Sequence, residues 1–540
     1  MAMARAVRAL PWLAVLAVAL CGGAALEGPD GLEDPFAVPE GLLIGAGVSA
    51  IQTEGAWDED GKGESAADHL LHIGKLSAFG FGNDSREHDV AADSYHRYKE
   101  DVRAAAQLGL KLYRFSISWS RVLPDAVTRN EKGVQYYHRL IDEVLKYNMT
   151  PMVTLYHFDH PWILEDQFKG WQSEKMVDYF KEFARLAFSE YAGKAKLWIT
   201  INEANNYCTY FPNLYQKVGL YADGDMDPFT CMRHTILAHA EAYHLFKEAG
   251  HEGQVGFSAL VFTARPNSTR PEDVYSADAF NQVAAGVLLN PVVHGDYPEL
   301  FKRLAGSNLQ PFSDAQKRRI KGTADFLACN VYFGIVAAFT TADMTAFSKV
   351  PILGQYLAVL PFVSPSVVGT DLSHMSSMFS VVTPDAMRSA VVWAWNEYRL
   401  PLVISENGFG DIYGLGKKDR LRGVYHSLYL RSLVSTMKEF SIKVIGYCTW
   451  SLIDSFEWSA GYSRPFGLVH VDYEGGSLDR SMKDSSQFWI DLARTGSVPL
   501  WEEDTASSAS STATSATLLL LLAMPAYFLS SSLANQYISL

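Results

Sequence analysis

Two glutamates that end apolar, strand-like runs are the residues of this sequence best placed for acid–base chemistry. Glu203 closes "LWITINE" at residues 197–203, and Glu406 lies near the end of "LPLVISENG" at residues 400–408. A solvated or salt-bridged side chain is the ordinary expectation for any single glutamate. Here apolar residues precede both, and no cation adjoins either in the sequence. Two carboxyl groups held at one site can supply general acid and general base catalysis.

The elements that must position these glutamates alternate along the chain. Apolar helical patterns at residues 95–109, 136–148, 177–191 and 385–398 fall between short β-rich runs. Such alternation predicts a parallel sheet with crossover helices. The strand candidates cover residues 42–50, 112–119, 150–158, 197–203, 254–260, 325–333, 400–408 and 444–452.

The strand candidates favour an α/β fold built as a single (β/α)8 TIM barrel with long loops at its C-terminal face. An open doubly wound sheet is the rival, but no G-x-G-x-x-G loop follows the first strand run. Glu203 would end the fourth strand and Glu406 the seventh. Because the carboxyl ends of barrel strands meet at one face, we expect the two glutamates to lie close together.

Composition sets the domain organisation and excludes some partners. The chain has 540 residues, of which 48% are hydrophobic, and no Gly/Ser- or Pro-rich linker interrupts residues 35–500. We therefore expect one catalytic domain over residues 26–500. The formal net charge of −14 disfavours nucleic acid and anionic lipid surfaces, which need clustered Lys and Arg. A neutral or cationic small molecule is easier to accommodate.

The N-terminus predicts export. Arg5 and Arg8 precede an apolar run to Leu20 and then small residues, a pattern typical of a signal peptide over residues 1–25. Glycosylation sequons begin at Asn83, Asn148 and Asn267.

The cysteines fit an oxidising compartment. Cys208 and Cys231 flank a polar stretch and are candidates for a disulfide, at even odds with two free thiols. Cys329 and Cys448 lie inside strand-like runs, where buried thiols are expected.

Residues 501–540 resemble a second targeting signal. A stretch rich in small polar residues precedes an apolar run from Thr517 to Leu529 that Pro525 interrupts, and no Lys or Arg follows it. A spanning helix needs about 20 apolar residues and usually basic flanks. The pattern favours a GPI-like lipid-anchor signal, with a short single-pass anchor as the alternative. The expected location is the secretory pathway, ending at the extracellular face of the plasma membrane or in secreted form.

Several motifs in the same order resemble glycoside hydrolase family 1, the retaining β-glycosidases of the β-glucosidase and lactase type. "TINEA" is similar to the acid/base motif of that family and "VISENG" to its nucleophile motif. The resemblance runs from about Pro35 to Trp489, and an animal lactase-like or klotho-related branch is possible. Further similar blocks are "GAGVSAIQTEGAW" (45–57), "YRFSISWSRVLP" (113–124), "LYHFDHP" (155–161), "DFLACNVYF" (325–333) and "WSLIDSFEWSAGYSRPFGLVHVDY" (450–473).

The resemblance implies a double displacement on a neutral β-glucoside, β-galactoside or oligosaccharide, without metal or other cofactor. Glu406 would be the nucleophile and Glu203 the acid/base. Arg114 would hold Glu406 ionised, and Tyr332 would donate a hydrogen bond to it. A charged Glu406 would keep Glu203 protonated until the covalent intermediate forms. The residues implied to bind sugar are Gln52, His157, Asn202, Asn330, Trp450, Glu457, Trp458 and Phe466.

Two expectations qualify this assignment. An ionised Glu457 would accept sugar hydroxyl groups and repel a sugar phosphate. Neighbours on a regular strand face opposite ways, so Asn202/Glu203 and Glu457/Trp458 can share a site only where the backbone departs from regular pairing.

The sequence also departs from the family pattern at Ala204, Phe158, His160, Ser455 and Pro465. These departures keep open an alternative function, a catalytically weak or inactive glycan-binding ectodomain on the same fold.

A segment at residues 334–380 resists interpretation. Its apolar part predicts either a loop packed on the barrel or an exposed apolar lip, which would bind an aglycone or face a membrane. Oligomeric state is not indicated by any pattern in the sequence.

Overall fold

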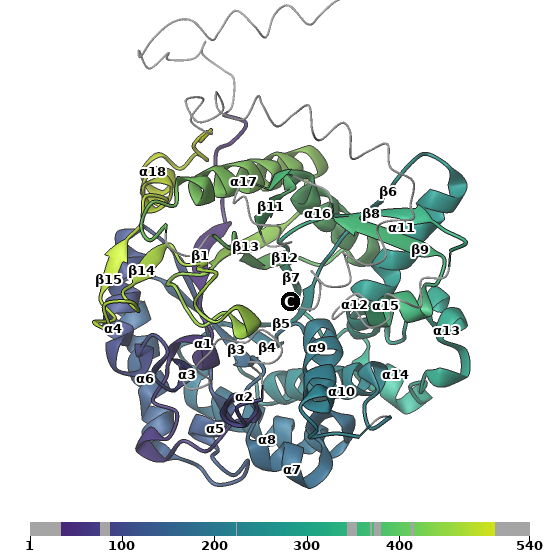
Figure 1. The fold of residues 1–540 in the computed structure, drawn as a ribbon, viewed down its shortest axis with the longest axis horizontal. Coiled ribbons are helices and arrows are strands. Elements are labelled where there is room, and N and C mark those ends of the chain that lie inside the picture. The colour runs from purple at the N-terminus through teal and green to yellow at the C-terminus, as the bar shows by residue number, and fades with distance from the viewer. Residues whose placement is uncertain are drawn as a thin grey trace, which may run out of the picture.

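Eight parallel strands close into a barrel at the centre of the molecule, as the alternation predicts. The computed structural model describes residues 34–75, 87–222, 224–342, 354–367, 370–371, 380–411 and 415–502. The barrel order is β1-β13-β12-β7-β5-β4-β3-β2, and β1 closes the ring by pairing with both β2 and β13 (Figure 1). The strands are β1 (Leu43–Gly47), β2 (Leu112–Ser116), β3 (Thr150–Tyr156), β4 (Leu197–Ile201), β5 (Gln254–Leu260), β7 (Phe326–Asn330), β12 (Leu402–Asn407) and β13 (Val444–Trp450).

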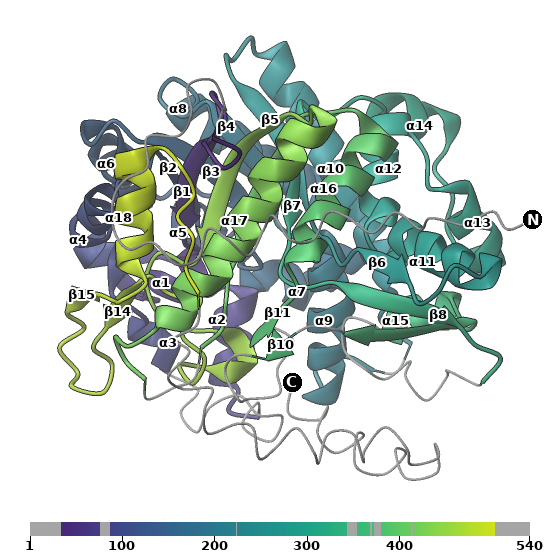
Figure 2. The same cartoon turned by 90° about the horizontal axis from the view of Figure 1, so that it is seen from above.

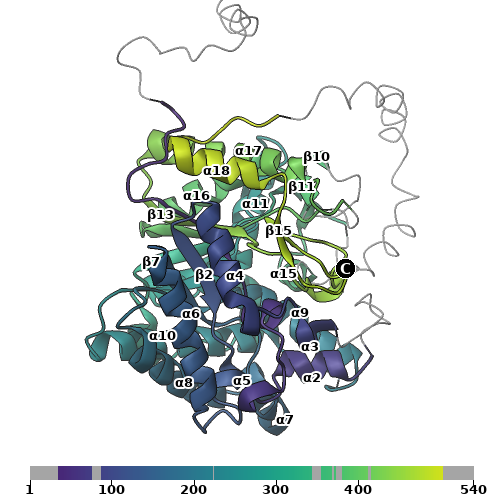
Figure 3. The same cartoon turned by 90° about the vertical axis from the view of Figure 1, so that its left-hand side faces the viewer.

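Helices surround this ring because each crossover returns the chain to the amino end of the next strand. Figure 3 shows α4, α6 and α8 following one another down one side of the barrel. Their buried residues recur at three- and four-residue spacings, as in Phe180, Phe183, Ala184 and Ala187 of α8. The main outer helices are α4 (Ser94–Gln107), α6 (Glu131–Lys146), α8 (Lys175–Tyr191), α10 (Pro228–Glu248), α11 (Pro271–Ala284), α12 (Gly286–His294), α14 (Asp314–Ile320), α16 (Pro384–Tyr398), α17 (Arg420–Phe440) and α18 (Ser486–Thr495).

The inside of the barrel changes from apolar to charged along the strands. Leu112, Met152, Phe326 and Val403 belong to one buried apolar cluster inside the ring. Side chains two residues apart on a strand share a face, so Arg114 of β2 stands on the same side as Leu112, nearer the carboxyl end. The strands thus place an apolar floor beneath a polar layer.

Long loops extend the carboxyl face, as expected. β6 (Ala264–Pro266), β8 (Ile335–Phe339) and β9 (Val363–Val367) form a separate small sheet, which lies to one side of the barrel in Figure 1. Figure 2 shows the neighbouring α15 (Gly354–Val359) on the side of the molecule that carries the loops. Other loop elements are α1 (Ala50–Thr53), α2 (Ala66–His72), α3 (Glu87–Val90), α5 (Trp119–Val122), α7 (Trp162–Phe168), α9 (Ala204–Lys217), α13 (Glu299–Ala305), β10 (Thr370–Asp371), β11 (Val381–Val382), β14 (Val469–Val471) and β15 (Arg480–Met482).

The described part of residues 334–380 packs on the barrel. Tyr356, Leu357, Leu360 and Val363 are all buried, and the Tyr356 hydroxyl donates to the backbone oxygen of Asn205. This favours the packed-loop interpretation over an exposed apolar lip for these residues.

Some expectations fall on residues outside the described ranges. The signal peptide, the sequon at Asn83 and the anchor signal after Glu502 are among them. Within the described ranges, every helix is either too short or too polar to cross a bilayer.

Candidate active site

Glu406 reaches the polar layer where β12 departs from regular pairing. The register between β12 and β7 shifts between Ile404 and Glu406, and such a bulge re-aims side chains. Arg114 Nη1 donates to Glu406 Oε1 at 2.6 Å, and the Tyr332 hydroxyl donates to Oε2 at 2.7 Å. Two donors, one of them permanently charged, stabilise the carboxylate form of this buried side chain.

Glu203 is aimed by a sharp turn rather than by a strand. β4 ends at Ile201, and Glu203 adopts a left-handed conformation (φ 40°, ψ 54°) at the start of α9. Asn330 Nδ2 donates to its Oε1 at 2.7 Å and Asn206 Nδ2 to its Oε2 at 2.8 Å. Burial first, and then the charge of Glu406, raise the pKa of Glu203 to about 8.

A continuous chain of hydrogen bonds joins the two glutamates. Arg114 Nη2 donates to Asn202 Oδ1 at 2.7 Å, and Asn330 Nδ2 donates to the same oxygen at 3.1 Å. The structure therefore brings together side chains from β12, β2 and β7 and from the carboxyl end of β4. The two glutamates share one buried network, as expected for strand ends that meet at one face of the barrel.

The remaining polar residues implied by the resemblance form a second group beside this network. Gln52 Nε2 donates to Glu457 Oε2 at 3.2 Å and to the Phe456 backbone oxygen at 2.8 Å. The Trp450 indole lies 3.5 Å from the same Glu457 oxygen and stacks on the His157 ring, with an interplanar angle of 16°. Burial holds the pKa of His157 well below its usual range, so this imidazole is neutral.

The charge state of Glu457 differs from the expectation. Burial, with a further contribution from Glu406, raises the pKa of Glu457 to about 8. The side chain is therefore protonated near neutral pH and can donate as well as accept a hydrogen bond. Its charge opposes a sugar phosphate only above that pKa.

Both adjacent pairs depart from regular strand geometry, as required. Glu457 lies outside the strands, and Trp458, which follows it, has a φ of +45°. The Trp458 ring packs beside Phe158 at 5.6 Å between centroids, and Phe466 packs edge-on to Tyr332 at 6.3 Å. Aromatic side chains thus stand next to the polar groups, which is typical of sugar sites.

The residues that depart from the family pattern pack or form hydrogen bonds within the fold. His160 is buried between the Tyr156 hydroxyl and the Glu165 carboxyl group, at 3.0 and 2.9 Å. The backbone oxygen of Pro465 accepts a hydrogen bond from Arg422. Ala204 and Ser455 are buried. None of the five residues is among the side-chain hydrogen-bond partners of Glu203 and Glu406 in the described part of the chain.

Sequence reasoning missed several residues that contact this network, among them Ser258, whose hydroxyl donates to Asn202 Oδ1, and Thr154, which accepts from Arg114. Asn206 donates to Glu203 from one turn into α9, and the Ser405 hydroxyl donates to Asn330 Oδ1. The motif "NEANN" contained the signal for Asn206, because a residue three positions after a helix-starting glutamate faces back toward it.

Cys208 of α9 and Cys231 of α10 form a disulfide, which resolves the even odds from the sequence. Cys329 and Cys448 are buried free thiols, as predicted. Asn148 and Asn267 are exposed, so the described geometry permits glycosylation at both.

The model of the family "Glycosyl hydrolase family 1" matches residues 35–497. The chain belongs to this family. It is 35% identical to Myrosinase 1 of Brevicoryne brassicae over 486 residues, covering 85% of this chain and 99% of that protein. It is 34% identical to Beta-glucosidase 6 of Oryza sativa subsp. japonica over 491 residues, covering 85% and 90% of the two proteins.

The solved structures agree with these relatives. A rice β-glucosidase superposes with a TM-score of 0.77 at 32% identity, covering 85% of this chain and 99% of that one. As a member of glycosyl hydrolase family 1 with β-glucosidase relatives, the protein is a glycosidase.

Proposed function

We propose that this family 1 enzyme is a retaining β-glycosidase that hydrolyses neutral β-D-glucosides or β-galactosides through a covalent glycosyl–enzyme intermediate. One observation carries the proposal. Glu406 is held as a carboxylate by Arg114 and Tyr332, while Glu203 in the same network has a pKa of about 8. Opposite protonation states in one buried pair suit a nucleophile and a general acid.

In the first step, a Glu406 oxygen forms a bond to the anomeric carbon as the bond from that carbon to the aglycone oxygen breaks. Glu203 transfers its proton to the departing oxygen. The resulting ester removes the negative charge of Glu406, which is one of the causes that raise the pKa of Glu203. Glu203 is then ionised and can accept a proton from water.

In the second step, the water oxygen bonds to the anomeric carbon and the Glu406 carboxylate leaves with its electron pair. Asn202 is fixed beside Glu406 through Arg114, where its amide would meet the sugar 2-hydroxyl group. Gln52 and the protonated Glu457 present donors and acceptors to the other hydroxyl groups. This pattern suits an uncharged sugar.

The relatives support the same chemistry. A mutant of the rice β-glucosidase has been solved in a covalent complex with glucose. In this chain, Glu203 provides the general acid that hydrolysis of an O-glycoside with a poor leaving group requires.

Trapping with a 2-deoxy-2-fluoro-β-glucoside tests the proposal. The fluorine slows hydrolysis of the ester, so we expect one sugar per chain attached to Glu406, located by peptide mass spectrometry. Glu406→Gln should remain unlabelled and inactive. If folded wild-type protein takes up no label while still binding glycosides, the glycan-binding alternative holds instead.

We further propose export and C-terminal anchoring through a lipid. The basic and apolar N-terminal run supports export, and so does the Cys208–Cys231 disulfide, because such bonds persist in oxidising compartments. Treatment of intact expressing cells with a phosphatidylinositol-specific phospholipase should release the enzyme into the medium. Release only by detergent would favour a membrane-spanning anchor.

A further inference from the structure

A cluster of histidines and carboxylates lies between α2 and α3, outside the catalytic network. His72, His88 and Asp89 each offer one ligand atom, and these atoms lie within 4.8 Å of one another. His72 ends α2, and the other two belong to α3. Fifteen residues separate the two histidines in the sequence, so spacing alone did not indicate a metal site.

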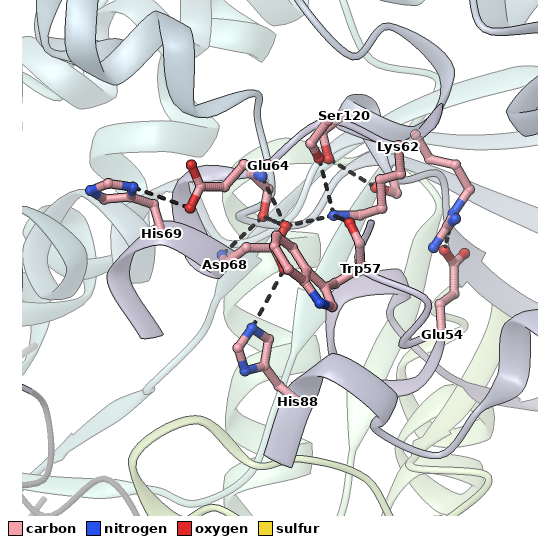
Figure 4. Close-up of polar contacts among 12 residues, drawn as sticks. Glu54, Trp57, Lys62, Glu64, Asp68, His69, His88 and Ser120 are labelled. Atoms are coloured by element: carbon pink, nitrogen blue, oxygen red, sulfur yellow. Dashed lines mark hydrogen bonds and ion pairs between the residues drawn. The ribbon is translucent and has the colours of Figure 1, made fainter. Parts of the chain in front are cut away.

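His88 is a buried residue that the catalytic function leaves unexplained. Its side chain is 1% exposed, and among the described residues its ring nitrogens make ion-pair contacts with Asp68 and Asp89 but no hydrogen bond. An imidazole buried in this way costs free energy unless another group satisfies it. Figure 4 shows the ring pointing toward Asp68, which Lys62 approaches from another side.

The distances around His88 are too long for hydrogen bonds but suit a bridging cation. His88 Nε2 lies 3.5 Å from Asp89 Oδ1 and 3.6 Å from Asp68 Oδ1. Zn²⁺ bonds of about 2.0–2.1 Å at tetrahedral angles hold neighbouring ligand atoms roughly 3.4 Å apart. His72 Nε2, now 2.7 Å from Asp89 Oδ1, would move away by a fraction of an ångström to become the third ligand.

Neighbouring groups would orient the ligands. Glu64 Oε1 lies 3.7 Å from His72 Nδ1, the nitrogen that faces away from Asp89. A carboxylate behind a histidine is the usual outer partner of a metal-bound imidazole. A small cavity lined in part by Trp57, Lys62, Asp68 and His88 lies against one member of the cluster and is about large enough for one water molecule.

We propose that His72, His88 and Asp89 bind one divalent transition-metal ion of the Zn²⁺ class, which ties α2 to α3. Two imidazole nitrogens and one carboxylate oxygen form a donor set typical of zinc. The ion would also brace the sugar site, because His88 packs against Phe456, whose backbone oxygen holds Gln52.

Zinc binding by tag-free protein tests the proposal. After stripping with EDTA and reloading, wild-type protein should retain one Zn²⁺ per chain through gel filtration, measured by elemental analysis. Its melting temperature should rise with free zinc concentration, because the ion binds the folded state.

Variants of two ligands and of one outer partner sharpen the test. His72→Ala and His88→Gln should each lose more affinity than the roughly 10–100-fold that removal of an outer partner costs. Glu64→Gln should fall within that range. In EDTA, His88→Gln should melt close to wild type, which shows that it folds.

His96→Ala is the matched control. His96 also lies between two carboxylates, those of Asp93 and Glu59, but its side chain is 49% exposed. This variant should keep the bound zinc. The proposal is overturned if wild-type protein retains no stoichiometric zinc, or if His72→Ala and His88→Gln bind it as tightly as wild type.

Discussion

Glu203 and Glu457 illustrate how burial sets the chemistry of single residues in this enzyme. Both pKa values rise to about 8, mainly because burial disfavours the charged form, and Glu406 adds to each. Glu406 is buried as well, but Arg114 and Tyr332 compensate its charge. The same side-chain type therefore plays different parts according to its neighbours.

The protonation of Glu203 predicts an alkaline limit to activity. The general acid must carry its proton, so kcat/KM should fall as pH rises through about 8 in the free enzyme. On a glucoside with a poor leaving group, Glu203→Gln should be slow and lose this limb, whereas Glu457→Gln should keep it. A limb that follows Glu457 instead would contradict the assignment.

The dependence of rate on the leaving group provides a second test of the acid role of Glu203. Glu203→Gln should lose about 10²–10⁴-fold in rate on glucosides with poor leaving groups, because the departing oxygen then lacks a proton donor. Activated leaving groups need little protonation and should lose far less in the glycosylation step. Equal losses across a series of aryl glucosides would count against an acid role.

Asn206 tunes the pKa of the general acid, Glu203. Its amide donates to Glu203 Oε2 at 2.8 Å, and this bond lowers the pKa of Glu203 against the effect of burial. Asn206→Ala should therefore move the alkaline limb of kcat/KM to higher pH. Asn213→Ala removes an amide on the same helix that donates to the backbone oxygen of Thr209, and should leave the limb in place. An unmoved limb in Asn206→Ala would remove Asn206 from the catalytic network.

At the scale of elements, the helix that begins at Glu203 is tied to its neighbour by a disulfide. Cys208 in α9 and Cys231 in α10 are 23 residues apart in the sequence. Closing a loop of this length contributes about 3 kcal/mol in the chain-entropy model. α9 also packs through buried residues such as Tyr207, Phe211 and Leu214.

We expect the double variant Cys208→Ser/Cys231→Ser to fold but to lose about 2–4 kcal/mol of the free energy of unfolding. Urea denaturation followed by circular dichroism measures this loss. A reducing agent should bring wild-type protein toward the variant and leave the variant itself unchanged. If the two proteins unfold at the same urea concentration without reductant, the bond does not stabilise this part of the fold.

At the scale of the whole molecule, the two ends of the described domain contact each other. Val38 N donates to the Gly496 oxygen at 2.8 Å, and Val498 N donates to the Phe36 oxygen at 3.0 Å. The Arg431 guanidinium group lies 3.3 Å from the centre of the Phe36 ring. Strand pairing closes the barrel, and these contacts join the first and last segments of the described domain.

A chain of residues 34–502 should therefore fold and keep its activity. A chain of residues 40–502 should lose at least about 1–3 kcal/mol, since several hydrogen bonds and a cation–aromatic contact disappear. These bonds include the two backbone bonds above and the bond from Lys438 Nζ to the Asp34 oxygen. Thermal unfolding of the two chains measures the difference. Equal melting temperatures would show that the paired termini do not contribute.

The barrel fold and the two glutamates of the site could be predicted from the sequence. Apolar runs ending at Glu203 and Glu406 predicted strands whose carboxyl ends meet, because strand and helix periodicities are local properties that a sequence records directly. The family motifs added Arg114, Tyr332 and Asn330, and the structure places all three on the two carboxyl groups.

Only the tertiary structure decided the charge states and the contacts between distant segments. The protonation of Glu457, the pairing of Cys208 with Cys231 and the meeting of His72 with His88 all depend on which groups lie nearby and how much water they lose. Desolvation and through-space charge are properties of the packed chain. A sequence lists the ionisable groups, whereas the fold sets the surroundings that determine what each group does.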